Sequence, residues 1–252
     1  MKIDLTEKNI LVTGASRGIG RAVARQMAEA GARVAVHYRS SQGEAEALAR
    51  EAGGSAQAFQ ADFRKTGDCA RLFDDVTSAF GGVDVLVNNA GIARHMPLDD
   101  GQAQWADDWN AMMAVNLRAP ELLCRKAIGH FQENGGGRIL NVASRAAFRG
   151  DTEDYMAYAA SKGGLVALTR SIARAFGGDD VQAFVLAPGF TRTDMAQEFI
   201  DSYGEDYATN DLALNRLTEP SDIAPLAVLF ASGLADHATG ATVDVNAGSY
   251  VH

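Results

Sequence analysis

A tyrosine and a lysine four residues apart, Tyr158 and Lys162, are the residues best suited to proton transfer in this chain. In a helix, this spacing places both side chains on one face. A phenol with a pKa near ~10 is a poor acid or base at neutral pH, although a nearby lysine charge favours its ionised form. Moving that pKa to ~7 requires about 4 kcal/mol. An isolated pair of this kind is usually a surface feature of a helix, so its meaning depends on the elements around it.

A glycine-rich turn precedes the first predicted helix. It reads Thr13-Gly14-Ala15-Ser16-Arg17-Gly18-Ile19-Gly20 and follows an apolar, β-branched run. Glycines at a strand-to-helix turn allow a tight bend and close approach of a pyrophosphate to the helix N-terminus. The spacing is G-x-x-x-G-x-G, not the G-x-G-x-x-G of ordinary dinucleotide-binding folds. The turn predicts a nucleotide-binding site. The alternative is that the glycines serve only the geometry of a strand-to-helix turn.

Short apolar runs alternate with helical periodicity along the whole chain. Strands are predicted at residues 8–14, 33–38, 55–61, 83–87, 138–142, 181–186 and 241–245, and helices at residues 18–31, 43–52, 66–80, 105–132, 155–176 and 220–232. This alternation predicts an α/β protein with a Rossmann-like, doubly wound, parallel seven-stranded sheet and helices on both faces. No linker divides residues 1–252, so we expect one domain for dinucleotide binding and catalysis. The polar stretch at about residues 190–218 is predicted to form a lid over substrate, with Gly204 as its hinge.

Composition excludes several classes of partner. The 252 residues are 47% hydrophobic and carry a net charge of −9, which disfavours nucleic acid and anionic membrane surfaces. No apolar run reaches the ~18 residues of a membrane span. Residues 1–8 lack the apolar core of a secretory signal, and Cys69 and Cys124 match no ligand or redox spacing. We therefore expect a cytoplasmic protein with two buried free thiols.

Neither a metal site nor a hydrolase triad is predicted. The five histidines do not cluster, and no spacing of potential ligands suggests a metal. Ser144 lies outside any G-x-S-x-G motif and has no histidine near it in sequence. The partner expected from these observations is a small molecule.

Charge at the end of the second strand predicts the nucleotide. An acidic residue there would bind an adenosine ribose hydroxyl, but the chain reads His37-Tyr38-Arg39-Ser40. Arg39 and Arg17 could converge on a 2′-phosphate, because guanidinium binds phosphate with two parallel hydrogen bonds. We predict NADP(H) over NAD(H), with solvated surface arginines as the alternative.

Six motifs resemble those of the short-chain dehydrogenase/reductase family. They are Thr13-Gly-Ala-Ser-Arg-Gly-Ile-Gly20, Asn88-Asn-Ala-Gly91, Asn116, Ser144, Tyr158-Ala-Ala-Ser-Lys162, and Pro188-Gly189 with Thr193. Each alone is weak evidence, but together they follow the family's order and approximate spacing along essentially the whole chain.

The resemblance implies four catalytic residues. Tyr158 would be the general acid in carbonyl reduction and the general base in alcohol oxidation. Lys162 would lower the pKa of Tyr158 and hydrogen-bond the nicotinamide ribose. Ser144 would polarise the substrate oxygen, and Asn116 would hold a water that links Lys162 to solvent.

The resemblance also implies a cofactor site around the sheet's carboxyl edge. Asp62 and Phe63 would flank the adenine, residues 89–91 would form a wall of small residues, and the Thr191 backbone with the Thr193 side chain would hold the carboxamide. The full expected set is Gly14, Ser16, Arg17, Gly18, Ile19, Gly20, Arg39, Asp62, Phe63, Asn89, Ala90, Gly91, Tyr158, Lys162, Pro188, Gly189, Thr191 and Thr193.

Two connections are longer than is common in the family. The segment from Ser144 to Tyr158 has one extra residue and includes the acidic run at residues 151–154. The segment from Gly91 to Asn116 includes a histidine, His95, and two tryptophans. We expect the tryptophans to pack together and His95 to be solvated or to touch substrate.

Two neighbours of the Tyr-Lys pair resemble catalytic groups. Tyr155 lacks a lysine four residues later and is assigned to the pocket rim or the surface. Ser161 points elsewhere on the helix than Lys162 and is expected to have a structural or cofactor-side role.

Substrate prediction rests on charge. The family includes 3-oxoacyl-carrier-protein reductases, whose acidic partner requires a basic patch. Residues 132–137 contain no lysine or arginine, and Arg170 and Arg174 offer only a small basic face. The loop at residues 151–154 and the lid acids Glu198, Asp201, Glu205 and Asp206 add negative charge. A small, neutral or cationic ketone, sugar or polyol is therefore favoured, with a 3-oxoacyl-carrier-protein or acyl-CoA reductase as the alternative.

Other classes and the assembly state stay open. A non-catalytic NADP-sensing protein would not need the intact Tyr158 and Lys162, and a methyltransferase needs neither these nor Asn116. Family members usually form tetramers through two long helices, so a homotetramer or homodimer is expected. The apolar run at residues 165–168 is consistent with such an interface and equally with a core.

Overall fold

The protein forms a single parallel sheet of seven strands. The computed structural model describes residues 3–204 and 209–251. The strands are β1 (Asn9–Val12), β2 (Arg33–Tyr38), β3 (Ala56–Gln60), β4 (Val85–Asn88), β5 (Gly137–Val142), β6 (Val181–Pro188) and β7 (Thr242–Val245). Their order across the sheet is β3-β2-β1-β4-β5-β6-β7, and every neighbouring pair is parallel. The predicted fold class is confirmed.

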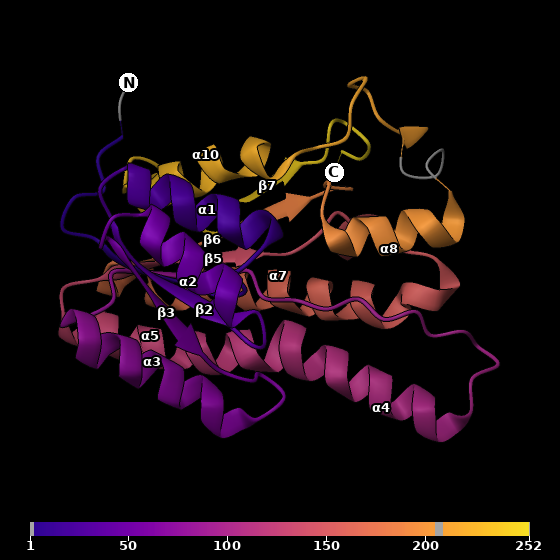
Figure 1. Ribbon diagram of the computed structural model, residues 1–252, viewed down its shortest axis with the longest axis horizontal. Helices are drawn as coiled ribbons and strands as arrows, with labels where there is room; N and C mark the ends of the chain where they lie inside the picture. Colours follow the sequence, from indigo (N-terminus) through magenta and orange to yellow (C-terminus); the bar gives the residue numbers. More distant parts are fainter. Residues whose placement is uncertain (1–2, 205–208, 252) are drawn as a thin grey trace.

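Helices cover both faces of the sheet (Figure 1). They are α1 (Gly18–Glu29), α2 (Gln42–Glu51), α3 (Thr66–Phe80), α4 (Gln102–Met113), α5 (Ala119–Glu133), α6 (Ala146–Arg149), α7 (Met156–Phe176), α8 (Asp194–Tyr203) and α10 (Pro220–Ala231). Single turns of 3-10 helix occur at η2 (Glu153–Tyr155), η3 (Gly177–Asp179) and η4 (Asp236–Ala238). Helices α1, α2 and α10 share one apolar core with the sheet, and α3, α5 and α7 share another. The five central strands are largely buried on both sides, which explains their apolar runs, whereas the edge strands β3 and β7 are only partly buried.

The strand order reverses between β1 and β4. Ile10 of β1 pairs with Val34 of β2 on one side and with Val85 of β4 on the other. The connections that leave the carboxyl ends of β1 and β4 therefore run in opposite directions and open a crevice between them. The glycine turn follows β1 directly, so the topology places it beside this crevice.

The long helix predicted at residues 105–132 is interrupted. Helix α4 passes into a π-helical segment, η1 (Ala114–Arg118), before α5 begins. Asn116, inside η1, donates from its amide to Ile92 O at 2.8 Å and accepts from Ile92 N at 2.8 Å. A π-turn adds a residue to the helix and re-aims its side chains, often at functional sites. A periodic sequence pattern carries no signal for such a local insertion.

Two short helices lie outside the six predicted helices, one of them in the stretch for which only some helical character was expected. Helix α6 follows Ser144, and α8 lies inside the stretch predicted to form a lid. Of the four acids assigned to that lid, Glu205, Asp206 and the Glu198 side chain lie outside the described residues. The run at residues 165–168 is mainly core, because Leu165 and Val166 are buried. Among the described residues, none of the helices is long and apolar enough to cross a membrane.

Candidate active site

A cavity of about 360 Å³ opens at the carboxyl edge of the sheet. It runs from the end of β2, past the glycine turn, to the segments after β5 and β6. Seventeen of the eighteen expected cofactor residues line this cavity together with Ser144, and the exception is Gly20, which is buried in the turn. These are Gly14, Ser16, Arg17, Gly18, Ile19, Arg39, Asp62, Phe63, Asn89, Ala90, Gly91, Tyr158, Lys162, Pro188, Gly189, Thr191 and Thr193.

The glycine turn is shaped by close contacts. Gly14 and Gly18 have φ values of +62° and +55°, in the left-handed region that favours glycine. A Cβ on Gly14 would lie 2.8 Å from Ala90 Cα, and one on Gly20 would lie 2.3 Å from Gly14 O. Gly20 therefore supports the turn from behind and lets α1 pack closely against it. The amides of Asn89 and Ala90 donate to Thr13 Oγ1 at 2.9 and 3.0 Å, which joins the turn to the segment after β4.

A buried histidine, His37, also holds the turn, and the sequence interpretation gave it no role. Gly14 N donates to His37 Nδ1 at 3.0 Å, so the ring hydrogen sits on Nε2, which donates to Ala61 O at 3.2 Å. The ring stacks on Phe63 with centroids 4.3 Å apart. Burial lowers the pKa of His37 to about 4, against a weaker opposing effect of the Ala61 carbonyl. His37 is neutral near pH 7 and links the glycine turn to the ends of β2 and β3.

The end of β2 presents a cation to the cavity. Arg39 is exposed and lines the wall beside Tyr38 and Ser40, without a carboxylate among these three residues. Asp62, at the end of β3, pairs with Arg64, and this hydrogen bond lowers the pKa of Asp62 to about 2. Arg39 and Arg17, the two expected phosphate ligands, have different surroundings. Arg17 Nη1 lies 3.0 Å from Asp194 Oδ2 of α8. Arg17 thus connects the glycine turn to α8.

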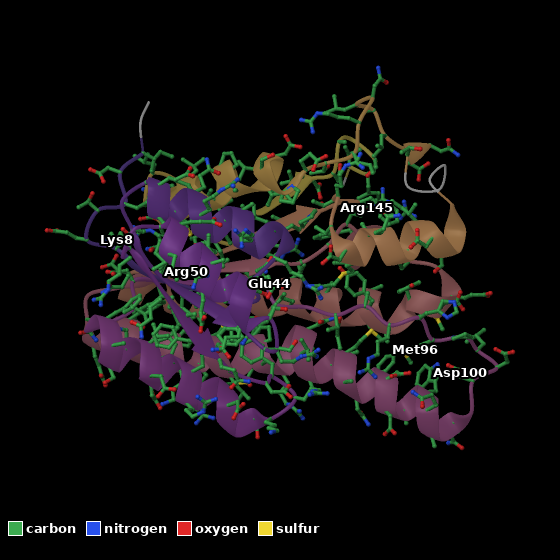
Figure 2. All side chains as sticks on the ribbon, viewed as in Figure 1. Lys8, Glu44, Arg50, Met96, Asp100 and Arg145 are labelled. Carbon is green, nitrogen blue, oxygen red and sulfur yellow. The ribbon has the colours of Figure 1, made fainter. Side chains whose placement is uncertain are left out.

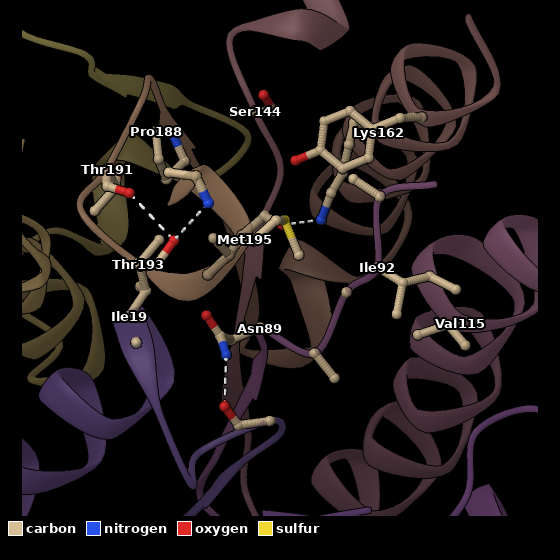
Figure 3. Close-up of a pocket in the computed structure, with 18 of the residues that line it drawn as sticks. Ile19, Asn89, Ile92, Val115, Ser144, Lys162, Pro188, Thr191, Thr193 and Met195 are labelled. Atoms are coloured by element: carbon tan, nitrogen blue, oxygen red, sulfur yellow. Dashed lines mark hydrogen bonds between the residues drawn. The ribbon is translucent and has the colours of Figure 1, made fainter. Parts of the chain in front are cut away.

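The catalytic residues expected from the resemblance meet at the other end of the cavity. Figure 3 shows Ser144 and Lys162 on one side and Pro188, Thr191 and Thr193 on the other. Lys162 Nζ donates to Val142 O at 2.9 Å and lies 5.8 Å from the centre of the Tyr158 ring. Helix α7 places Tyr158 and Lys162 on one face, as their spacing predicts.

Burial sets the protonation of this pair. It raises the pKa of Tyr158 to about 12; a hydrogen bond with Ser144 opposes this shift and the charge of Asp151 adds to it. Burial also lowers the pKa of Lys162 to about 8. The protein without nucleotide therefore does not show the expected lowering of the Tyr158 pKa by Lys162. Desolvation of the phenol outweighs the effect of a lysine that is itself desolvated.

Asn116 lies behind the cavity wall, next to the lysine. A Cβ on Gly91 would be 3.3 Å from Lys162 Nζ and 3.4 Å from Asn116 Oδ1, so Gly91 leaves room for both groups. Asn116 Nδ2 also donates to Ser161 Oγ at 3.0 Å, and Ser161 Oγ donates to Tyr158 O at 2.7 Å. Ser161 is fully buried and structural, which agrees with its sequence interpretation.

The segment after β6 is ordered by hydroxyl groups. Thr191 Oγ1 donates to Gly189 O and Thr193 Oγ1 donates to Thr191 O, each at 3.1 Å. Thr193 also caps α8 by accepting from Ala196 N at 3.4 Å. A Cβ on Gly18 would lie 3.2 Å from Thr193 Cγ2, so the start of α8 directly adjoins the glycine turn.

The substrate end of the cavity has a mixed lining that the sequence interpretation described only in part. It foresaw the acidic loop, and Asp151 does line the cavity. It missed Arg145, which is 6% exposed beside α8 (Figure 2), and Arg149. The Arg145 guanidinium lies 4.8 Å from the centre of the Phe190 ring. Both arginines follow Ser144 closely in the chain, and this proximity was the available signal.

The residues that resembled catalytic groups take supporting positions. Tyr155 lines the cavity at its rim and lies 5.3 Å from the Phe199 ring centre. His95 Nε2 lies 3.2 Å from Asp154 Oδ2, and His95 is not part of the cavity wall. Trp105 and Trp109 stack with centroids 5.2 Å apart, which confirms packing. Within residues 3–204 and 209–251, no three potential ligands cluster to hold a metal ion.

Comparison with known proteins identifies the family. The family model described as Enoyl-(Acyl carrier protein) reductase matches residues 14–250. The 3-oxoacyl-[acyl-carrier-protein] reductase FabG of Staphylococcus epidermidis is 36% identical over 97% of this chain and 99% of its own length. The chain belongs to the short-chain dehydrogenase/reductase family, and it is an oxidoreductase.

Relatives of this oxidoreductase differ in substrate and nucleotide. D-threitol dehydrogenase of Mycolicibacterium smegmatis is 35% identical over 97% of this chain and 93% of its own. A short-chain dehydrogenase from Burkholderia cenocepacia, solved in complex with NADP, has a TM-score of 0.90 and 34% identity over 97% of this chain and 98% of its own. The 3-ketoacyl-(acyl-carrier-protein) reductase from Brucella melitensis, complexed with NADH, has a TM-score of 0.90 and 32% identity over 98% and 100% of the two chains.

Proposed function

We propose that the protein transfers a hydride between NADP(H) and a carbonyl or secondary alcohol of a small ketone, sugar or polyol. The convergence of Ser144, Tyr158 and Lys162 at one end of a cavity whose other end is bordered by the glycine turn carries this proposal. The cavity fits a dinucleotide because it extends from the end of β2, past the glycine turn at the N-terminus of α1, to the segments after β5 and β6.

Each catalytic residue has a distinct task. Tyr158 gives its proton to the substrate oxygen in reduction and takes it back in oxidation. Ser144 hydrogen-bonds and polarises the same oxygen, while Lys162 holds the nicotinamide ribose and Asn116 supports a water route to solvent. The bound nicotinamide supplies or accepts the hydride, and its oxidised ring carries a positive charge that favours the phenolate.

The pKa values suit Tyr158 to act as a general acid near neutral pH. With a pKa of about 12, Tyr158 holds its proton across the physiological range and is ready to act as an acid. Lys162, with a pKa of about 8, keeps its charge at neutral pH and loses it as the pH rises. Turnover in the reducing direction should therefore fall above about pH 8 as Lys162 deprotonates.

Replacement of the catalytic phenol tests this function. Tyr158→Phe should lower kcat/KM for carbonyl reduction by about 10²- to 10⁴-fold, the usual contribution of a general acid. Its affinity for NADPH, followed by nucleotide fluorescence, should stay close to that of the wild type. The matched control is Tyr155→Phe, which removes a hydroxyl at the rim without removing the acid. An unaltered rate in Tyr158→Phe would refute the assignment.

The NADP(H) preference is carried by Arg39. Its side chain lines the cavity at the end of β2, where an acidic residue would otherwise bind the ribose hydroxyl. Arg17 is paired with Asp194, so Arg39 is the better placed of the two arginines for a 2′-phosphate. The relatives bind either NADP or NADH, so the preference is a property to be tested in this chain.

A charge reversal tests the nucleotide preference. Arg39→Asp should weaken NADPH binding and favour NADH, because a carboxylate repels a 2′-phosphate and accepts from a 2′-hydroxyl. The Kd values of both nucleotides measure the change. Arg25→Asp makes the same charge change on an exposed residue of α1, outside the cavity wall, and should leave the ratio of Kd values unaltered. Retained NADPH preference in Arg39→Asp would disprove the proposal.

A 3-oxoacyl-carrier-protein or acyl-CoA reductase is the second candidate function. The names of the Staphylococcus and Brucella relatives favour it. The charged lining contributed by Arg149 and Asp151 favours a polar substrate instead. Acetoacetyl-CoA and a hydroxylated ketone such as erythrulose, compared as substrates with NADPH, distinguish the two.

The proposal extends to a lid over the site, to the cellular compartment and to the assembly. Residues 190–218 act as the lid, because Met195, Ala196 and Phe199 of α8 line the cavity. The enzyme works in the cytoplasm as a homotetramer or homodimer. Buried, unpaired Cys69 and Cys124 are compatible with that reducing compartment.

A further inference from the structure

The substrate end of the cavity combines charge with aromatic surface. Asp151 and Arg149 line it together with the rings of Tyr155 and Phe190. They come from the end of α6 and the loop after it, from η2 and from the segment after β6. An apolar acyl chain offers no hydrogen-bonding group to these charges. Hydroxyl groups both donate and accept hydrogen bonds, so they match a lining that contains a carboxylate and a guanidinium.

Asp151 lines this end of the cavity from the turn that follows α6. It follows Gly150, whose φ of +79° ends α6 in a conformation that favours glycine. Asp151 Oδ1 accepts a hydrogen bond from Thr152 N at 2.9 Å. An ionised carboxylate offers about four lone-pair positions, so most of its accepting capacity is left for a ligand.

The charges around Asp151 define what it can bind. Burial raises the pKa of Asp151, while Arg149 and Arg145 lower it. The negative charge of Asp151 in turn acts on Tyr158. Arg149 Nη1 lies 3.4 Å from Asp211 Oδ2, which balances part of its positive charge. The carboxylate therefore lies within electrostatic reach of the phenol, in surroundings of nearly balanced charge.

We infer that Asp151 determines substrate specificity by accepting a hydrogen bond from a hydroxyl group near the reacting carbon, so that polyhydroxylated ketones and polyols are the preferred substrates. This inference rests on the proposed hydride transfer and narrows its substrate class. Arg149 donates to a second hydroxyl of the same substrate.

A pair of four-carbon ketones provides the first test. Erythrulose carries hydroxyl groups on the carbons around its carbonyl, and 2-butanone carries none. Asp151→Asn should lower kcat/KM for erythrulose by about ten- to a hundredfold, the range for a hydrogen bond to a charged group, and change that for 2-butanone much less. The control is Glu153→Gln, which removes a charge from the same loop at an exposed residue outside the cavity wall. Equal losses on both ketones, or no loss on erythrulose, would overturn the inference.

Binding without turnover provides the second test. Threitol should bind to the enzyme saturated with NADP, as measured by calorimetry, and Asp151→Asn should weaken that binding while Glu153→Gln leaves it nearly unchanged. Failure of threitol to bind the wild-type complex would also overturn the inference. Reduction of 2-butanone by the wild type, with no preference for erythrulose, would contradict the role of Asp151 and leave the proposed function intact. Threitol binding with no turnover of any carbonyl would contradict the proposed function and support the site.

Discussion

Tyr158 and Lys162 show how burial acts on single residues. Desolvation disfavours the charged form of each side chain, so it raises the pKa of the phenol and lowers that of the ammonium. The Tyr158–Lys162 pair is consequently nearer to its uncharged forms than isolated residues would be. A positive charge placed beside Tyr158 has a large effect in these dry surroundings, because a low dielectric strengthens each electrostatic interaction. Burial by the protein therefore sets the pKa values of the pair in the absence of nucleotide, and a positively charged nicotinamide would lower the pKa of Tyr158.

His37 predicts a pH dependence of stability at the residue scale. Its pKa is about 4 in the folded protein and 6.5 ordinarily, so the contribution of the neutral ring is complete above pH 6.5 and is lost as the pH falls toward 4. The loss should reach about 3 kcal/mol by pH 4, at ~1.36 kcal/mol per pH unit. His37→Gln, whose amide does not titrate, should lose less stability over this range, as urea unfolding at several pH values will show.

An exposed histidine gives the control for this measurement. His237 lies on the surface in η4, and His237→Gln should keep the wild-type pH dependence. If His37→Gln and the wild type lost stability in parallel between pH 6.5 and 4, carboxylates would account for the acid sensitivity instead.

At the scale of elements, the turn between β1 and α1 depends on how closely α1 approaches the strand. A Cβ on Gly20 would lie 2.3 Å from Gly14 O and 2.4 Å from Asn89 Nδ2. Neither atom can move freely, because Asn89 Nδ2 donates to Thr13 O at 2.9 Å and to Gly14 O at 3.1 Å. Helix α1, the turn and the segment after β4 all pack together at Gly20, so any side chain at position 20 disturbs the contacts among them.

Gly20→Ala should therefore lose both stability and nucleotide binding. We expect a cost of about 1–3 kcal/mol, typical of overpacking, and a higher Kd for NADPH. Gly43→Ala is the matched control, because a Cβ at this position in α2 meets nothing within 4 Å. That variant should be neutral or more stable by up to ~1 kcal/mol, since alanine favours helix over glycine. Thermal unfolding and nucleotide titration of both variants test the contrast, and a stable Gly20→Ala with unchanged Kd would contradict it.

At the scale of the whole molecule, the two apolar cores account for most of the large apolar side chains. Leu165 is also buried, and Val166 packs with Ala143 and Val185 in a separate small cluster, so the run at residues 165–168 gives little support to an interface between subunits. The proposed assembly rests on the family resemblance instead. Light scattering should give a mass of two or four times the 26.7 kDa of the chain, and a mass of one chain would disprove the assembly.

The sequence by itself determined the sheet and the order of the site residues. Buried parallel strands must be apolar over their length, and a helix must repeat its apolar positions, so both patterns are visible in the chain. Glycines before α1 and the spacing of Tyr158 and Lys162 are local requirements, which a sequence also displays. Only the tertiary structure decided the π-turn at Asn116, the anchoring by His37, the pairing of Arg17 with Asp194 and the direction of the Tyr158 pKa. Each of these depends on which distant groups approach and on how much water they exclude, and spacing along the chain does not encode that.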